Sequence, residues 1–178
     1  MNQLRLFRVS LMIMKYFIIT LLFSISIIGK SNEPIKAAKD SVQVDSLIKF
    51  CKKQLGTHYL YASCSPESGF DCSGFVFYVF NHFKIKVPRS SVDYINVGKT
   101  IHPDSFKVGD VIVFTGTNLK IRTPGHVGII VTNSGKKLQF IHSSSNKKDS
   151  GVKISNYNDS ENYKKRFLKI VRVTHVYK

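Results

Sequence analysis

The sequence lacks the motifs of several common kinds of functional site. It has no C-x-x-C pair and no H-E-x-x-H helix, so its cysteines and histidines do not indicate a metal site, and we expect no cofactor. It also has no arginine-rich helix and no repeat of aromatic and basic residues, which argues against nucleic-acid binding. Its 178 residues, 43% of them hydrophobic, suffice for one globular domain with a full core.

The N-terminus has the layout of a secretory signal peptide. A largely apolar run without charged residues covers residues 16–28, and it is preceded by three basic residues, Arg5, Arg8 and Lys15. A run of this length is too short to span a bilayer comfortably. We therefore predict a signal peptide over residues 1–30 and export to the periplasm, the extracellular space or the cell wall. An uncleaved membrane anchor is the alternative, and Met14 offers a second possible start.

Acidic residues are scarce, with 11 against 27 basic residues and a net charge of +16. Residues 1–29 hold three of the basic residues and none of the acidic ones, so the remainder carries +13. The lysines are spread singly and in pairs, which favours diffuse attraction to an anionic cell envelope over a nucleic-acid surface. We expect a monomer that meets the envelope through this basic surface.

Cysteine is also scarce, and its three positions are an odd number for a chain bound for an oxidising compartment. Two arrangements are open: Cys51 and Cys64 form a disulfide and leave Cys72 free, or all three remain reduced.

The hydrophobic pattern predicts helices first and strands last. A polar stretch over residues 31–43 predicts a linker, and the domain then covers residues 44–178. Apolar residues recur at helical spacing from Val44 to Leu55, whereas residues 57–70 resemble a loop. The run from Phe75 to Phe80 has strand propensity, but its length favours a helix reaching Lys84. Later apolar runs predict a sheet of five or six strands, including those over residues 111–114, 126–131, 138–142, 151–154 and 167–177. This order is typical of an α+β domain.

One cysteine stands where a reactive thiol is expected. Cys72 lies between a glycine-marked turn and the start of the predicted helix, and Asp71 before it suits the N-cap position. Unpaired N–H groups at a helix start lower a thiol pKa, so we expect a lowered pKa for Cys72. The alternative for a lone cysteine beside Phe and Val is simple core packing. Downstream, His126 and His142 each lie on a predicted strand and could supply a base and its orienting partner.

Six segments in order carry a resemblance to a known family. They are Leu55-Gly56-Thr57-His58-Tyr59, Phe70-Asp71-Cys72-Ser73-Gly74, Val87-Pro88-Arg89-Ser90-Ser91, Val108-Gly109-Asp110-Val111, Gly125-His126-Val127-Gly128 and Ile141-His142-Ser143. Together they resemble the NlpC-type cell-wall cysteine peptidases over roughly residues 44–173. The resemblance implies a trimmed papain-like α+β fold, with the cysteine on a helix that packs against an antiparallel sheet carrying the histidines.

The resemblance also implies roles for individual residues. Cys72 would be the nucleophile, His126 the general base and His142 the residue that orients the imidazole. Tyr59 and the backbone N–H of Cys72 would bind the oxyanion. Asp71 and Ser73 would hold the free amine at the end of a peptidoglycan stem peptide. For Asp71 the alternative is an ordinary N-cap, and both roles are compatible.

The implied activity is hydrolysis of an amide bond in stem peptides, between γ-linked D-glutamate and the diamino acid. Alternatives are the diaminopimelate–D-alanine cross-link, an amidase or acyltransferase of related fold, and a wall-binding protein that does not cleave. The chain departs from the family pattern at His58, at residues 61–64 and at Tyr94, which stands where glutamine is often found. These departures leave the reaction intact and put the substrate subsite in question.

Overall fold

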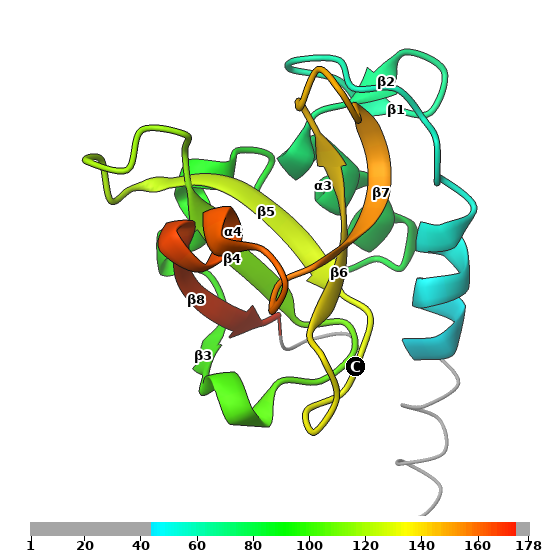
Figure 1. Cartoon of the computed structure of the whole chain (residues 1–178). Coiled ribbons are helices and arrows are strands. Elements are labelled where there is room, and N and C mark those ends of the chain that lie inside the picture. Colours follow the sequence, from blue (N-terminus) through cyan, green and yellow to red (C-terminus); the bar gives the residue numbers. More distant parts are fainter. Residues whose placement is uncertain (1–43, 174–178) are drawn as a thin grey trace, which may run out of the picture. The chain divides into compact units, whose positions relative to one another are not determined.

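The computed structural model describes residues 44–173, which belong to one compact unit, Val42–Lys178 (Figure 1). The predicted signal peptide over 1–30 and linker over 31–43 lie outside the described residues, as does the last part of the strand expected over 167–177. Within residues 44–173, no helix is long and apolar enough to cross a membrane.

A six-stranded antiparallel sheet forms the centre of the domain. Its strands are β3 (Lys99–Ile101), β4 (Val111–Thr115), β5 (Pro124–Ile130), β6 (Gln139–Ser144), β7 (Gly151–Asn156) and β8 (Phe167–Arg172). Their order in the sheet is β3-β8-β4-β5-β6-β7. Strand β4 is buried along its whole length because both faces of the sheet are covered. The predicted α+β, trimmed papain-like fold with the cysteine helix against the sheet is confirmed.

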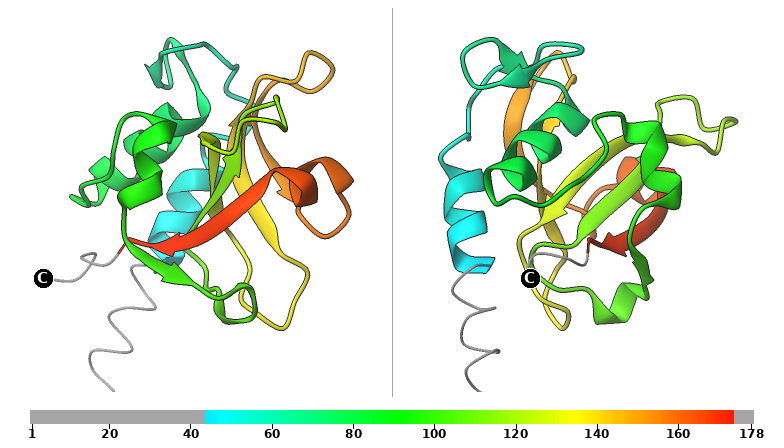
Figure 2. Two further views of the ribbon diagram at one scale, coloured as in Figure 1. Left: turned by 90° about the vertical axis from the view of Figure 1, so that its left-hand side faces the viewer. Right: turned by 180° about the vertical axis from the view of Figure 1, so that it is seen from behind.

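Successive side chains along the strands point alternately into two separate hydrophobic cores. Val111, Val113 and Val127 face one core, together with Phe75 and Val79 of helix α3 (Cys72–His82). Even-numbered neighbours face the other core, which includes Ile112, Phe114, Ile130 and Phe140 and is flanked by Tyr163 of the short helix α4 (Glu161–Arg166). Figure 2 shows α3 and α4 on opposite sides of the sheet. Residues 44–52 are also helical, as their spacing predicts.

Some elements differ from the sequence-based expectation. The stretch over 57–70 is not only a loop, since β1 (Cys64–Ser65) and β2 (Gly69–Phe70) pair as a small antiparallel sheet. Strand β3 and helix α4 were not expected, because each has only a few residues and no clear periodicity. Two 3₁₀ helices, η1 (Ser91–Asn96) and η2 (Pro103–Ser105), lie in the connection between α3 and β4.

Gly74 allows the β1–β2 hairpin to lie directly against the start of α3. A Cβ atom added at Gly74 would lie 2.0 Å from the carbonyl oxygen of Ser63. That carbonyl accepts the backbone N–H of Asp71 at 3.0 Å, so it cannot move away without breaking the connection to the helix start. The close contact with Ser63 therefore explains why the Asp-Cys-Ser-Gly segment has a glycine at position 74.

We expect Gly74→Ala to lower the free energy of unfolding by more than about 2 kcal/mol, because a methyl group would overlap a backbone atom. Gly116→Ala is the matched control, since a Cβ at Gly116 has no neighbour within 4 Å. Urea denaturation of both variants measures the difference. Equal stability of the two variants would contradict the proposed contact.

Candidate active site

The start of α3 is held in place by hydrogen bonds on both sides of Cys72. Asp71 is the N-cap residue, and its Oδ1 accepts the backbone N–H of Gly74 at 2.6 Å. One residue earlier, the Phe70 carbonyl accepts the hydroxyl of Ser143 at 2.7 Å. Because Ser143 follows His142 on β6, this bond fixes the cysteine helix against the strand that carries the second histidine.

Strands β5 and β6 separate where the site lies. Their backbone pairing is confined to Ile129–Ile141 and Ile130–Phe140, so the first part of β5 has no β6 partner. The backbone N–H of Val127, on this unpaired part of β5, is close enough to the Cys72 sulfur to act on it and to lower the pKa of the thiol. Since Val127 follows His126 directly, the structure places the thiol next to the first predicted histidine.

The two predicted histidines contact each other across the same opening. His126 Nε2 lies 3.0 Å from His142 Nδ1. The other nitrogen of His142, Nε2, lies 2.9 Å from the Ser155 hydroxyl and 3.4 Å from the Tyr163 hydroxyl. The rings of Phe140 and Tyr163 pack against His142, with centroids 4.8 and 5.8 Å away. His142 is therefore fully enclosed, and its orientation is set by polar contacts at both ring nitrogens.

Both histidines are held in the neutral form. Burial lowers the pKa of His126 well below its usual value, and the charges of Arg166 and Lys153 add to the effect. Burial likewise lowers the pKa of His142, and its neighbour His126 is the second cause. Arg166 is itself buried and donates two hydrogen bonds to the carbonyl of Thr115, at 2.9 and 3.2 Å. A neutral imidazole is the form that can accept a proton.

The thiol pKa differs from the sequence-based expectation. Burial raises the pKa of Cys72, and the carboxylate of Asp71 adds to this. The backbone N–H groups of Val127, Ser73 and Cys72 act in the opposite direction, as expected for a helix start, but they are outweighed. The prediction of a lowered thiol pKa was therefore wrong, because the burial of a side chain is a tertiary property that local sequence does not contain. In the free protein Cys72 is a thiol beside a neutral imidazole.

The carboxylate of Asp71, which was expected to bind a substrate amine, already accepts several hydrogen bonds from within the protein. Arg89 forms a two-armed ion pair with it, at 3.0 Å to Oδ1 and 2.7 Å to Oδ2. The Ser73 hydroxyl donates to Oδ1 at 3.2 Å, and Gly74 donates to the same oxygen. Oδ1 thus receives three donors, whereas Oδ2 receives one, from Arg89. Oδ2 is the oxygen with capacity for a further donor.

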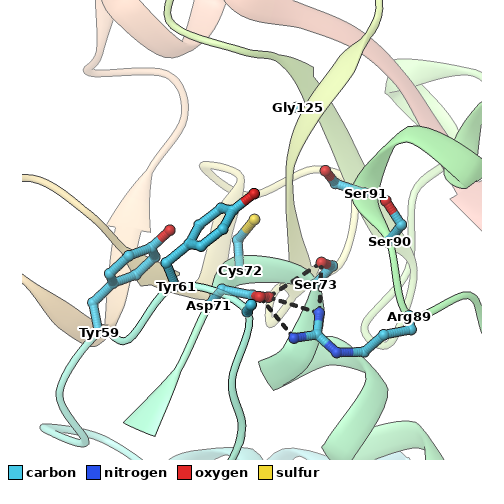
Figure 3. A pocket seen from close by; sticks show the side chains of 10 residues that line it. Tyr59, Tyr61, Asp71, Cys72, Ser73, Arg89, Ser90, Ser91 and Gly125 are labelled. Carbon is cyan, nitrogen blue, oxygen red and sulfur yellow. Dashed lines mark hydrogen bonds and ion pairs between the residues drawn. The ribbon is translucent and has the colours of Figure 1, made fainter.

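An open pocket connects these groups. Figure 3 shows Tyr59 and Tyr61 on one side of Cys72, and Arg89, Ser90 and Ser91 on the other. Ala62 and Gly125 also line the pocket. Burial is the main cause that raises the pKa of the Tyr59 hydroxyl, and negative charges on Cys72 and Asp71 raise it further. Four of the six predicted site residues, Cys72, Tyr59, Asp71 and Ser73, line this pocket. His126 directly follows Gly125 of the pocket wall, and the fully buried His142 contacts His126.

Several neighbouring residues were not assigned a role from sequence. Arg89 lies in one of the six segments that resemble the family, so the sequence contained a signal that it belongs near the cysteine. Ser155 and Tyr163 had no such signal, because only the pairing of β7 with β6 and the position of helix α4 bring them into contact with His142. Cys51, Cys64 and Cys72 are all free, so of the two arrangements considered the structure has three free thiols.

We expect the histidine pair to make the protein less stable in mild acid. An unfolded histidine binds a proton near pH 6.5, whereas the folded pair does so only at lower pH, so the unfolded chain gains protons first as pH falls. The loss approaches about 1.4 kcal/mol per pH unit for each histidine below pH 6.5. Urea denaturation at pH 7, 6 and 5 measures this slope. A His126→Asn/His142→Gln variant should have a shallower slope, and an unchanged slope would contradict the assignment.

Comparison with known proteins gives the family of this chain. The NlpC/P60 family profile matches residues 56–172. The chain is 28% identical over 144 residues to the protein named gamma-DL-glutamyl hydrolase of Bacillus subtilis (strain 168), covering 79% of this chain and 33% of that protein. It is 36% identical over 110 residues to murein DD-endopeptidase MepS/murein LD-carboxypeptidase of Escherichia coli (strain K12), covering 61% and 52%. The chain thus spans only part of the length of each of these curated relatives.

A solved structure gives the same result. The crystal structure of an NlpC/P60 family protein from Bacillus cereus ATCC 10987 matches with a TM-score of 0.63 and 27% identity, over 73% of this chain and 40% of that chain. The family profile covers more than half of the present sequence, and the fold agrees. This chain therefore belongs to the NlpC/P60 family.

Proposed function

We propose that the protein is an exported cysteine endopeptidase that hydrolyses amide bonds in peptidoglycan stem peptides. The observation that carries the proposal is the thiol of Cys72, placed at the opening between β5 and β6 beside two neutral, mutually bonded histidines. A thiol, an adjacent base and a group that orients the base are the parts that nucleophilic amide cleavage requires. Relatives named as murein or γ-glutamyl hydrolases support the choice of substrate.

In the first half of the reaction, the proton of the Cys72 thiol passes to His126. His126 Nε2 faces His142, so Nδ1 is the nitrogen that accepts the proton. The sulfur attacks the scissile carbonyl carbon, and the carbonyl oxygen becomes an oxyanion. The N–H of Cys72 at the helix start and the hydroxyl of Tyr59 are the donors that stabilise it.

In the second half, the C–N bond breaks and the imidazolium of His126 gives its proton to the leaving amine. A thioester between Cys72 and the acyl fragment remains. Water then attacks this thioester, His126 accepts the water proton, and the thiol is restored as the acid product leaves. His142 keeps the imidazole in place throughout, and its second nitrogen is held by Ser155 and Tyr163.

The substrate subsite lies on the Asp71 side of the cysteine. Oδ2 of Asp71 has capacity for one further donor, and the Ser73 hydroxyl is adjacent, so an ammonium group at the end of a stem peptide fits there. This favours a cut close to the free end of the stem, between γ-linked D-glutamate and the diamino acid. The name of the Escherichia coli relative keeps a cross-link between stems as the second candidate.

Export and attachment complete the proposal. The apolar run within residues 1–30 supplies the export signal, and the net positive charge of the remaining chain holds the enzyme near an anionic wall. No nucleic acid or cofactor takes part. Attachment of this kind weakens as the salt concentration rises.

We expect the protein to cleave defined muropeptides, and Cys72→Ala to abolish cleavage. His126→Ala should lower kcat by about 10²–10⁴-fold, because it removes the general base. Mass spectrometry of the products identifies the bond that is cut. Cleavage that persists in Cys72→Ala, or folded and reduced wild-type protein that leaves every muropeptide intact, would contradict the proposal.

The amine subsite is tested by changing the substrate, since Asp71 also caps α3 and its replacement would disturb the helix. We expect acetylation of the N-terminal amine of the stem peptide to slow cleavage by at least about tenfold, because a charge-assisted hydrogen bond to Asp71 is lost. Amidation of the far C-terminal carboxylate of a longer stem peptide is the control. Equal rates for the free and acetylated peptides would rule out an ammonium site at Asp71.

A further inference from the structure

Two hydroxyl groups lie beside Nε2 of His142, the ring nitrogen that does not face His126. The Ser155 hydroxyl is 2.9 Å from this nitrogen and the Tyr163 hydroxyl is 3.4 Å from it. Nδ1 of the same ring lies 3.0 Å from Nε2 of His126. The two histidines and the hydroxyls therefore form one chain of polar contacts, which begins at the proposed general base and ends at Ser155.

Two elements to which the sequence assigned no role in the site hold these hydroxyls. On β7, Ser155 is the register partner of Phe140, which lies two residues before His142 on β6. Because residues two apart on a strand share a face, Ser155 projects on the same face as His142. The Tyr163 ring of α4 packs against Phe140 and His142, with centroids 5.0 and 5.8 Å away. Strand pairing and ring packing therefore fix both oxygens.

The chain of contacts admits two arrangements of protons, because a neutral imidazole carries one N–H and a hydroxyl can donate or accept. In the first arrangement, Nε2–H of His126 donates to Nδ1 of His142, and Nε2–H of His142 donates to a hydroxyl oxygen. In the second, Nδ1–H of His142 donates to Nε2 of His126, and the His126 proton lies on Nδ1. Only the first arrangement leaves Nδ1 of His126 free to accept the Cys72 proton.

We propose that Ser155 is a positioning residue that accepts the Nε2–H of His142 and thereby selects the proton arrangement in which His126 can act as a base. This inference rests on the proposed role of His126. Ser155 is the principal acceptor, because 2.9 Å is an ordinary hydrogen-bond length and the 3.4 Å to Tyr163 is long.

The same contact also helps when His126 becomes charged. An acceptor beyond a ring N–H fixes the tautomer of an imidazole and increases the basicity of its other nitrogen. Nδ1 of His142 is therefore a stronger acceptor for the imidazolium that His126 forms when it takes the thiol proton. Each proton of His142 and Ser155 stays on its own residue throughout the reaction.

The tautomers can be measured without substrate. The ¹⁵N chemical shift distinguishes a ring nitrogen that carries a proton from one that does not, and His126→Asn and His142→Gln spectra assign the signals. At pH 7 we expect both histidines of the wild type to carry their proton on Nε2. Ser155→Ala should move a measurable fraction of both to Nδ1, whereas Ser155→Thr, which keeps the hydroxyl, should preserve the wild-type tautomers.

Kinetics with a cleaved muropeptide measure the consequence. Ser155→Ala should lower kcat by about 10–100-fold, the range typical for loss of a residue that orients a functional histidine. KM should be unchanged, because the pocket is lined by other residues. Ser155→Thr should restore most of the rate. Asn156→Ala is the matched control, since it removes a 2.8 Å hydrogen bond to Gln139 from the next position on β7. It should change neither kcat nor the tautomers.

Three results would overturn the proposal. The first is a wild-type His126 with its proton on Nδ1. The second is a Ser155→Ala protein with wild-type tautomers, even if its melting temperature is lower, because Ser155 would then be only structural. The third is an unchanged kcat of Ser155→Ala when the wild type cleaves. If the wild type leaves every muropeptide intact, the proposed hydrolase activity fails, and the tautomers still decide this inference separately.

Discussion

The carboxylate of Asp71 is the group on which the cysteine end of the site depends. It caps helix α3 through Gly74, accepts the hydroxyl of Ser73 and forms a two-armed ion pair with Arg89. These bonds fix the first turn of the helix and, with it, the direction of the Cys72 side chain. Asp71, a single buried acidic residue, thus links the β1–β2 hairpin, helix α3 and the segment after α3 that carries Arg89. Asp71 also lines the pocket, where we propose that its remaining bonding capacity serves a substrate amine.

The histidine end of the site depends on a local failure of strand pairing. Regular pairing along all of β5 and β6 would use the Val127 N–H in the sheet, and no thiol could approach it. Because the two strands pair only at Ile129 and Ile130 on the β5 side, the opening admits the Cys72 sulfur. The same opening lets His126 and His142 meet edge to face. The geometry of the candidate active site is therefore a property of the sheet as much as of the helix.

Much of this arrangement was predictable from sequence, for identifiable reasons. Helix α3 and the longer strands have strong apolar patterns, and the order of six short motifs indicated the fold and the residues that lie together. The direction of the Cys72 pKa shift was not predictable, because it depends on burial. Ser155 and Tyr163 were missed since only the folded sheet brings them to His142. The roles of the site residues remain predictions that rest on their placement.

The most direct test of the account is to trap the covalent intermediate. During turnover of a stem peptide, acid quenching followed by intact-protein and peptide mass spectrometry should show one acyl fragment attached to Cys72 as a thioester. The mass of the adduct should equal that of the N-terminal fragment of the cleaved peptide less one water. Turnover that continues after Cys72 has been alkylated, or an adduct on a different residue, would contradict the assignment of Cys72 as the nucleophile.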